Sequence, residues 1–139
     1  MSEPIVYVDS SEIREGKLEE VKASIKKLVE FVHANEPQLL SYNFCLNEDG
    51  TRMTVVAVHP DSASMEFHMK VAGAAFRRFT ELINLSTIEV YGQPSDTVVD
   101  QLRQKAQMLG SGTVHVHKPY AGFARMQRAE SGGGEAARH

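Results

Sequence analysis

The order of helical and strand-like segments constrains the fold of this chain more than any other feature of its sequence. Two stretches, residues 17–35 and 61–83, repeat apolar side chains at steps of three and four, which is typical of helices that pack one face against a core. The apolar positions are Leu18, Val21, Ile25, Leu28 and Val32 in the first stretch, and Met65, Met69, Ala72, Phe76, Phe79 and Ile83 in the second.

Four runs of β-branched, aromatic or alternating residues lie around these two helices. They are residues 5–10, 39–46, 52–59 and 85–91. The resulting order of strand, helix, strand, strand, helix and strand predicts an α+β fold, the ferredoxin-like βαββαβ sandwich. Such a fold has one antiparallel sheet with two helices on a single face.

Local signals set the boundaries of these elements. The polar run 11–16 predicts a loop, and Pro37 stops the first helix. Residues 47–50 end in Asp-Gly, which favours a tight turn between two strands. Asp61 or Ser62 can cap the second helix by accepting from its first free backbone N–H groups.

The C-terminal part extends beyond this minimal unit. Ser95 can cap a third helix that ends near Leu109, and residues 113–118 predict a short fifth strand. We expect residues 1–125 to form a single domain, and residues 126–139 to form a disordered tail because they are rich in glycine and polar residues.

The two middle strands predict a second layer on the far face of the sheet. In residues 39–46 one face is apolar and the other carries Ser41, Asn43 and Cys45, whereas residues 52–59 are apolar on both faces. One layer of helices cannot cover both faces of a sheet, so we predict a homodimer that pairs its sheets face to face. Asn43 would then face the dimer seam, and Cys45 would be a buried, inert thiol.

Composition argues against several classes of protein. The net charge of −3 does not suit a nucleic-acid partner. No run approaches the roughly 20 apolar residues of a membrane span, and the N-terminus lacks the features of a signal peptide. Cys45 is the single cysteine, which excludes an intrachain disulfide, so we expect a cytoplasmic protein.

His68 is the best candidate for chemistry. It lies about 60° from the centre of the apolar stripe of residues 61–83, at the edge of the buried face. An imidazole there can accept a proton from a bound ligand near neutral pH. The structural alternative is a half-buried histidine bonded to a backbone carbonyl or a carboxylate.

Two further histidines, His115 and His117, share one face of the predicted fifth strand. A metal site needs three or four ligands, and His59 is the only other residue of a suitable type that we can associate with this pair. We therefore expect no metal site, and interpret residues 113–118 as a solvent-facing or dimer-rim strand. His59 and Tyr91 lie at strand ends, where the mouths of pockets occur.

The chain resembles the antibiotic biosynthesis monooxygenase (ABM) family of the dimeric α/β barrel superfamily in two places. One is the segment before the first helix, Glu12-Ile-Arg-Glu-Gly-Lys-Leu-Glu-Glu20. The other is the second helix, where Asp61 or Ser62 is followed by His68. The resemblance covers residues 4–92. It implies a dimeric α/β barrel. Proteins of this family include cofactor-independent monooxygenases, haem-degrading enzymes and proteins without established activity, so membership alone does not give the reaction.

Two functions remain open. The first is a cofactor-independent monooxygenase acting on a small aromatic or quinol-type substrate, with His68 as the base and no cofactor. The chain contains no tryptophan, so other aromatic residues must bind the substrate; we expect these to be Tyr42, Phe44, Phe76, Phe79 and Tyr91. The second is a non-catalytic dimer that binds a small apolar ligand or another protein.

Overall fold

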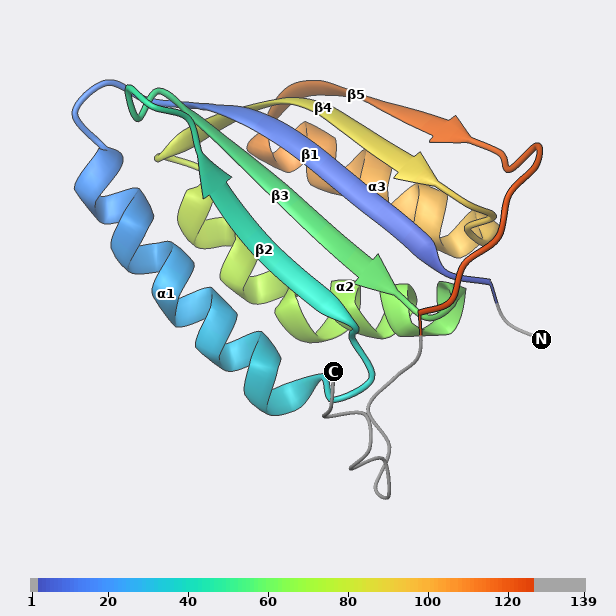
Figure 1. Cartoon of the computed structure of the whole chain (residues 1–139). Helices are drawn as coiled ribbons and strands as arrows, with labels where there is room; N and C mark the ends of the chain where they lie inside the picture. Colours follow the sequence, from blue (N-terminus) through green and yellow to red (C-terminus); the bar gives the residue numbers. More distant parts are fainter. Residues whose placement is uncertain (1–2, 127–139) are drawn as a thin grey trace.

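A five-stranded sheet forms one layer of the molecule, in the strand order β2-β3-β1-β4-β5 (Figure 1). This computed structural model describes residues 3–126. The strands are β1 (Ile5–Ile13), β2 (Ser41–Leu46), β3 (Arg52–His59), β4 (Ile83–Tyr91) and β5 (Gly110–His117). The helices are α1 (Leu18–Asn35), α2 (Ser62–Phe76) and α3 (Asp96–Leu109), with a 3₁₀ turn η1 at Arg77–Phe79.

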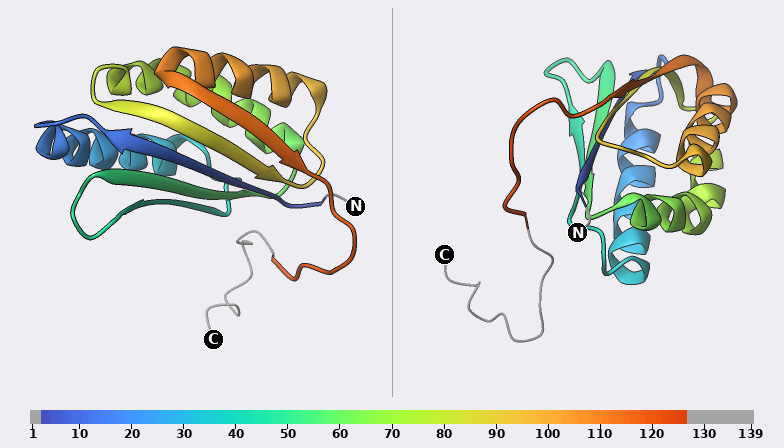
Figure 2. Two further views of the ribbon diagram at one scale, coloured as in Figure 1. Left: turned by 90° about the horizontal axis from the view of Figure 1, so that it is seen from above. Right: turned by 90° about the vertical axis from the view of Figure 1, so that its right-hand side faces the viewer.

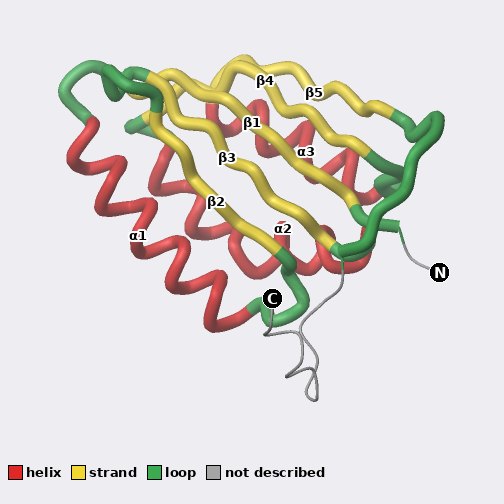
Figure 3. The backbone as a smooth tube through the Cα atoms, in the orientation of Figure 1, coloured by secondary structure: helices red, strands yellow, loops and turns green. Residues whose placement is uncertain are grey.

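The pairing of the strands confirms the ferredoxin-like α+β arrangement. β1 lies between β3 and β4, and β2 lies outside β3, all antiparallel. The C-terminal extension adds β5 parallel to β4, because α3 crosses over between them as parallel strands require. The sheet is therefore mixed, and it is an open layer (Figure 3).

All three helices cover the same face of the sheet (Figure 2, right). Every second residue of the strands points into this layer, as the burial of Ile5 and Tyr7 in β1 and of Met53, Val55 and Ala57 in β3 shows. The apolar stripe of α1 meets them through Val21, Leu28 and Val32. The core thus lies between one face of the sheet and the helices.

Two predicted boundaries were wrong at the start of the chain and after α2. β1 extends to Ile13, although we predicted a loop over 11–16, because its polar residues still pair with both neighbouring strands. The predicted helix 61–83 ends at Phe76; η1 follows, and Ile83 belongs to β4. Phe79 is nevertheless buried, because the tighter turn still directs it to the core.

The helix caps agree with the sequence. The Asp61 carboxylate accepts from the backbone N–H of Ser64 at 2.8 Å, and the Ser95 hydroxyl accepts from that of Val98 at 3.2 Å.

β5 begins at Gly110, directly after α3, rather than at residue 113. None of the helices over the described residues has the length and apolar character to cross a bilayer.

Within residues 3–126, no helix lies on the far face of the sheet. The prediction of a buried Cys45 was wrong for the chain by itself. Cys45 is exposed, and so is Asn43, whose side-chain amide donates to the Ser41 hydroxyl at 2.9 Å. Residues 118–126 continue from β5 on this side of the sheet (Figure 2, right). Of the tail expected over residues 126–139, residues 127–139 lie outside the described residues.

Candidate active site between sheet and helices

A small cavity lies under the sheet, between β1, β2 and the helices. The structure brings together His68 and four of the predicted aromatic residues in its lining, namely Tyr42, Phe44, Phe76 and Phe79. The free space is about 30 Å³, enough for one or two water molecules.

Tyr91 does not reach this cavity. It is exposed on the outer face and stacks on His117, with ring centroids 4.6 Å apart. Counted by simple alternation from the buried Leu85, Tyr91 would point inward, but Ser86 has no partner in β1, since Ser10 pairs with Thr87 and Ser11 with Leu85. Such a bulge reverses the faces of the residues that follow.

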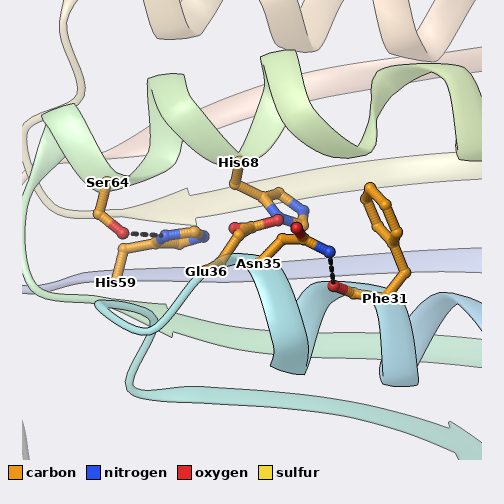
Figure 4. Close-up of polar contacts among 6 residues, drawn as sticks. All are labelled: Phe31, Asn35, Glu36, His59, Ser64 and His68. Carbon is orange, nitrogen blue, oxygen red and sulfur yellow. Dashed lines mark hydrogen bonds and ion pairs between the residues drawn. The ribbon is translucent and has the colours of Figure 1, made fainter.

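His68 is held by a buried carboxylate. Its Nδ1 lies 2.8 and 2.9 Å from the two carboxylate oxygens of Glu36, and both side chains are almost completely buried. The two residues point toward one another from α2 and from the end of α1 (Figure 4). A carboxylate accepts from Nδ1–H, so the tautomer with a free lone pair on Nε2 is favoured.

The end of α1 sets the position of Glu36. Its backbone N–H donates to the carbonyl of Val32 at 2.9 Å, and Pro37 prevents the helix from continuing. Sequence reasoning missed Glu36, although two signals pointed to it. It follows Val32 by four residues on the apolar stripe, and a carboxylate at a helix C-terminus is electrostatically unfavourable unless another group compensates it.

Three rings pack around His68. The ring centroids of Tyr42, His59 and Phe76 lie 5.2, 5.5 and 5.7 Å from its own. Burial, and then the charges of Asp9 and Glu36, raise the pKa of Tyr42 well above its usual value. Tyr42 therefore keeps its hydroxyl proton.

His59 lies at the end of β3, next to His68. Its Nδ1 is 2.9 Å from the Ser64 hydroxyl (Figure 4). Burial, followed by electrostatic interactions with His68 and Lys105, lowers the pKa of His59 to about 3. The ring is therefore neutral at physiological pH.

A second polar cluster, which sequence reasoning also missed, lines the same cavity: Tyr7, Asp9 and Lys105. Lys105 Nζ donates to the Tyr7 hydroxyl at 2.8 Å and to Asp9 Oδ2 at 3.3 Å, and the Tyr7 hydroxyl also donates to Asp9 Oδ2. Burial lowers the pKa of Lys105, and the negative charge of Asp9 opposes this shift. Burial also raises the pKa of Tyr7.

The sequence carried a signal for this cluster as well. Asp9 follows Ile5 and Tyr7 on the inward face of β1, and Lys105 lies on the stripe of α3 between the buried Leu102 and Ala106. A charged residue on an apolar stripe is rarely buried without a partner. One charge of each sign on facing elements therefore indicates an internal ion pair.

The histidines of β5 lie apart from the cavity. His117 Nε2 is 2.6 Å from a Glu89 carboxylate oxygen, and His115 Nε2 is 2.9 Å from the Thr113 hydroxyl. Within the part of the chain that the structure describes, no three residues of the types His, Cys, Asp and Glu gather closely enough to hold a metal ion.

Solved structures share this fold. The chain is similar to MupZ from Pseudomonas fluorescens, with a TM-score of 0.69 and 21% identity over 89% of this chain and 96% of that one. It is similar to SO0527 from Shewanella oneidensis, with a TM-score of 0.55 and 24% identity over 66% and 91% of the two chains. It is also similar to SnoaB, a cofactor-independent oxygenase from Streptomyces nogalater, with a TM-score of 0.57 and 12% identity over 68% and 96%.

No curated protein sequence matches the chain. The family model for antibiotic biosynthesis monooxygenase matches residues 4–82, which is more than half of the sequence and includes Glu36 and His68. At these low identities the solved structures support the fold, and the family model carries the assignment. The chain belongs to the antibiotic biosynthesis monooxygenase family.

Proposed function

We propose that this protein is a cofactor-independent monooxygenase that binds a small phenol or quinol between sheet and helices. The observation that carries the proposal is the buried pair of His68 and Glu36 at a cavity with aromatic walls. Family membership and the similarity of the fold to an oxygenase support it. The lone cysteine suits a cytoplasmic protein.

His68 is the proposed base. With Nδ1 bonded to Glu36, Nε2 is the nitrogen left to accept the hydroxyl proton of the substrate. Glu36 orients the ring and stabilises the positive charge that the ring acquires. Phe44, Phe76 and Phe79 would hold the apolar body of the substrate, and Tyr42 would hold the ring of His68.

The reaction balances with O₂ as the only co-substrate. The hydroxyl proton moves to Nε2, and the electron pair of the phenolate forms a bond between a ring carbon and O₂. The peroxide takes the proton back from Nε2, which returns the base; loss of water then breaks the O–O bond and the C–H bond of that carbon and leaves a carbonyl there. One oxygen atom enters the product quinone and the other leaves as water.

Substitution of His68 tests the base. We expect His68→Ala to lower the rate of O₂ uptake with a panel of quinols and phenols by about 10²- to 10⁴-fold, the usual contribution of a general base. His33→Ala is the matched control, because His33 is exposed on α1. Equal O₂ uptake by His68→Ala and wild type on an active substrate would disprove this role.

Substitution of Glu36 tests the positioning of His68. Glu36→Gln keeps the shape and an acceptor for Nδ1–H but loses the charge that stabilises protonated imidazole. We expect kcat to fall about 10²-fold or more, with the acidic limb of the pH–rate profile at lower pH. The exposed Glu30 provides the control, Glu30→Gln. An unchanged pH profile in Glu36→Gln would leave Glu36 with a structural role only.

The free space of about 30 Å³ favours one alternative, a dimer that binds a small ligand or partner without catalysis. An aromatic ring requires the side chains around the cavity to move. Native mass spectrometry of the purified protein separates the two functions. A ligand that remains bound and unchanged under O₂, with no uptake on any phenol or quinol, would support the binding protein.

A further inference from the structure

Two buried oxygen atoms beside the ion pair of Lys105 have no hydrogen-bond partner among the described residues: Asp9 Oδ1 and Ser11 Oγ. Asp9 is 2% exposed and Ser11 is 0% exposed. Both residues line the cavity that also contains His68. Buried polar groups are almost always hydrogen-bonded, so these two atoms indicate a missing partner.

The hydrogen bonds of the cluster explain why one oxygen of Asp9 is left over. Lys105 Nζ and the Tyr7 hydroxyl both donate to Oδ2, and nothing within the described chain donates to Oδ1. Lys105 Nζ also lies 4.2 Å from the ring centroid of Phe76 and 4.9 Å from that of Tyr7. The ammonium group thus also packs against these rings, and its hydrogen bond to Asp9 goes to Oδ2.

The charges limit what can bind there. Lys105 already balances the charge of Asp9, so a cationic ligand is not required, and the carboxylate disfavours an anion. A carboxylate oxygen only accepts hydrogen bonds, whereas a serine hydroxyl can donate or accept. A neutral hydroxyl group satisfies both atoms, because it donates to Asp9 Oδ1 and accepts from Ser11.

We propose that Asp9 and Ser11 bind a hydroxyl group of the ligand, which in a quinol substrate is a different hydroxyl from the one that gives its proton to His68, and that this protein therefore selects small alcohols or phenols over their ethers. This proposal rests on the proposed function, because Asp9 and Ser11 line the same cavity as His68. Phe76 contacts Lys105, and its ring centroid is 5.7 Å from that of His68. A ligand held at Asp9 and Ser11 thus lies along Phe76 toward His68.

Lys105 lies outside the part of the chain that the family model matches. The residue belongs to α3, whereas the family model matches residues 4–82. Asp9 and Ser11, on β1, lie inside that range. The C-terminal extension therefore completes a polar site of which the family domain supplies only one side.

Binding of phenol and anisole tests the proposal. The two molecules share a ring, but anisole cannot donate a hydrogen bond. We expect wild-type protein, titrated under nitrogen and followed by calorimetry or NMR, to bind phenol at least about tenfold more tightly, because an unpaired buried acceptor is costly. Equal binding of the two, or binding of neither, would overturn the proposal.

Ser11→Ala distinguishes ligand binding from a structural role. This hydroxyl has no partner within the described chain, so its loss should leave the melting temperature unchanged or higher while most of the preference for phenol disappears. Ser10→Ala is the matched control, since Ser10 lies on the opposite face of β1, where its hydroxyl accepts from Arg52 at 2.9 Å. It should keep the preference.

The opposite result would assign the two oxygens to a buried water molecule that supports the fold. In that case Ser11→Ala melts at a lower temperature, and its preference for phenol is unchanged. Asp9→Asn, if it folds, should lose the preference as well. If only the oxygenase proposal were wrong, phenol binding would still depend on Ser11, but neither wild type nor His68→Ala would consume O₂.

Discussion

At the scale of single residues, burial of His59 makes the stability of the fold depend on pH. The side chain is 1% exposed, and burial lowers its pKa to about 3, against about 6.5 for an unfolded chain. Between these values the unfolded state binds more protons than the folded state, so the free energy of unfolding falls as the pH falls. The stabilisation is complete above about pH 6.5 and is lost toward pH 3.

We expect the free energy of unfolding to fall by up to about 1.4 kcal/mol per pH unit below pH 6 from this residue. Urea denaturation between pH 4.5 and 7.5 measures it. His59→Asn, in which an amide replaces the titrating ring, should have a shallower pH dependence. His33→Asn, on an exposed surface, should not differ from wild type. A slope that His59→Asn leaves unchanged would contradict the assignment.

At the scale of elements, the junction of α3 and β5 depends on a close approach of the backbone. Gly110 follows the last residue of α3 without a loop and pairs with Leu85 of β4. A Cβ atom at this position would lie 2.6 Å from the backbone nitrogen of Leu85 and 2.8 Å from its carbonyl oxygen. Backbone atoms cannot move aside as the end of a flexible side chain can.

Gly110→Ala should therefore destabilise the protein by about 1–3 kcal/mol, the usual cost of overpacking. Gly73→Ala in α2 is the informative comparison, because a Cβ atom there meets nothing within 4 Å. It should stabilise the protein by up to about 1 kcal/mol, the difference in helix propensity. Thermal denaturation of both variants checks the pair, and equal melting temperatures would contradict the close packing.

At the scale of the whole molecule, we propose that a second copy of the chain binds the face of the sheet opposite the helices. Valines of β1 and β3 lie on it, half-buried by their neighbours in the strands. Residues 118–126 lie on the same side (Figure 2), and they carry Tyr120 and Phe123, which are 100% and 81% exposed. Exposed apolar groups of this kind mark interaction surfaces.

We expect a homodimer at micromolar concentration in native mass spectrometry. Val56→Glu, at the centre of this face, should raise the dissociation constant at least about 100-fold, because burying an unpaired carboxylate costs several kcal/mol. Ala23→Glu, at an exposed site on α1, should leave it unchanged. Wild-type protein that is a monomer under these conditions would disprove the paired sheets.

Local pattern in the sequence determined the order of the elements and the inward face of most of them. The steps of three and four in α1 and α2, the capping residues Asp61 and Ser95, and the alternation that points Tyr42 and Phe44 inward all appear in the structure. These features depend on residues a few positions apart, and the periods of helix and strand relate such residues directly.

Only the tertiary structure decided which polar groups meet. Glu36 reaches His68 across 32 residues, and Lys105 reaches Asp9 across 96; how the helices lie on the sheet sets both contacts, and no local period encodes it. The bulge at Ser86 turned Tyr91 outward for a related reason, since it depends on how β1 and β4 pair. The sequence alone therefore located His68, while the packing of distant elements supplied its carboxylate partner and the second polar cluster.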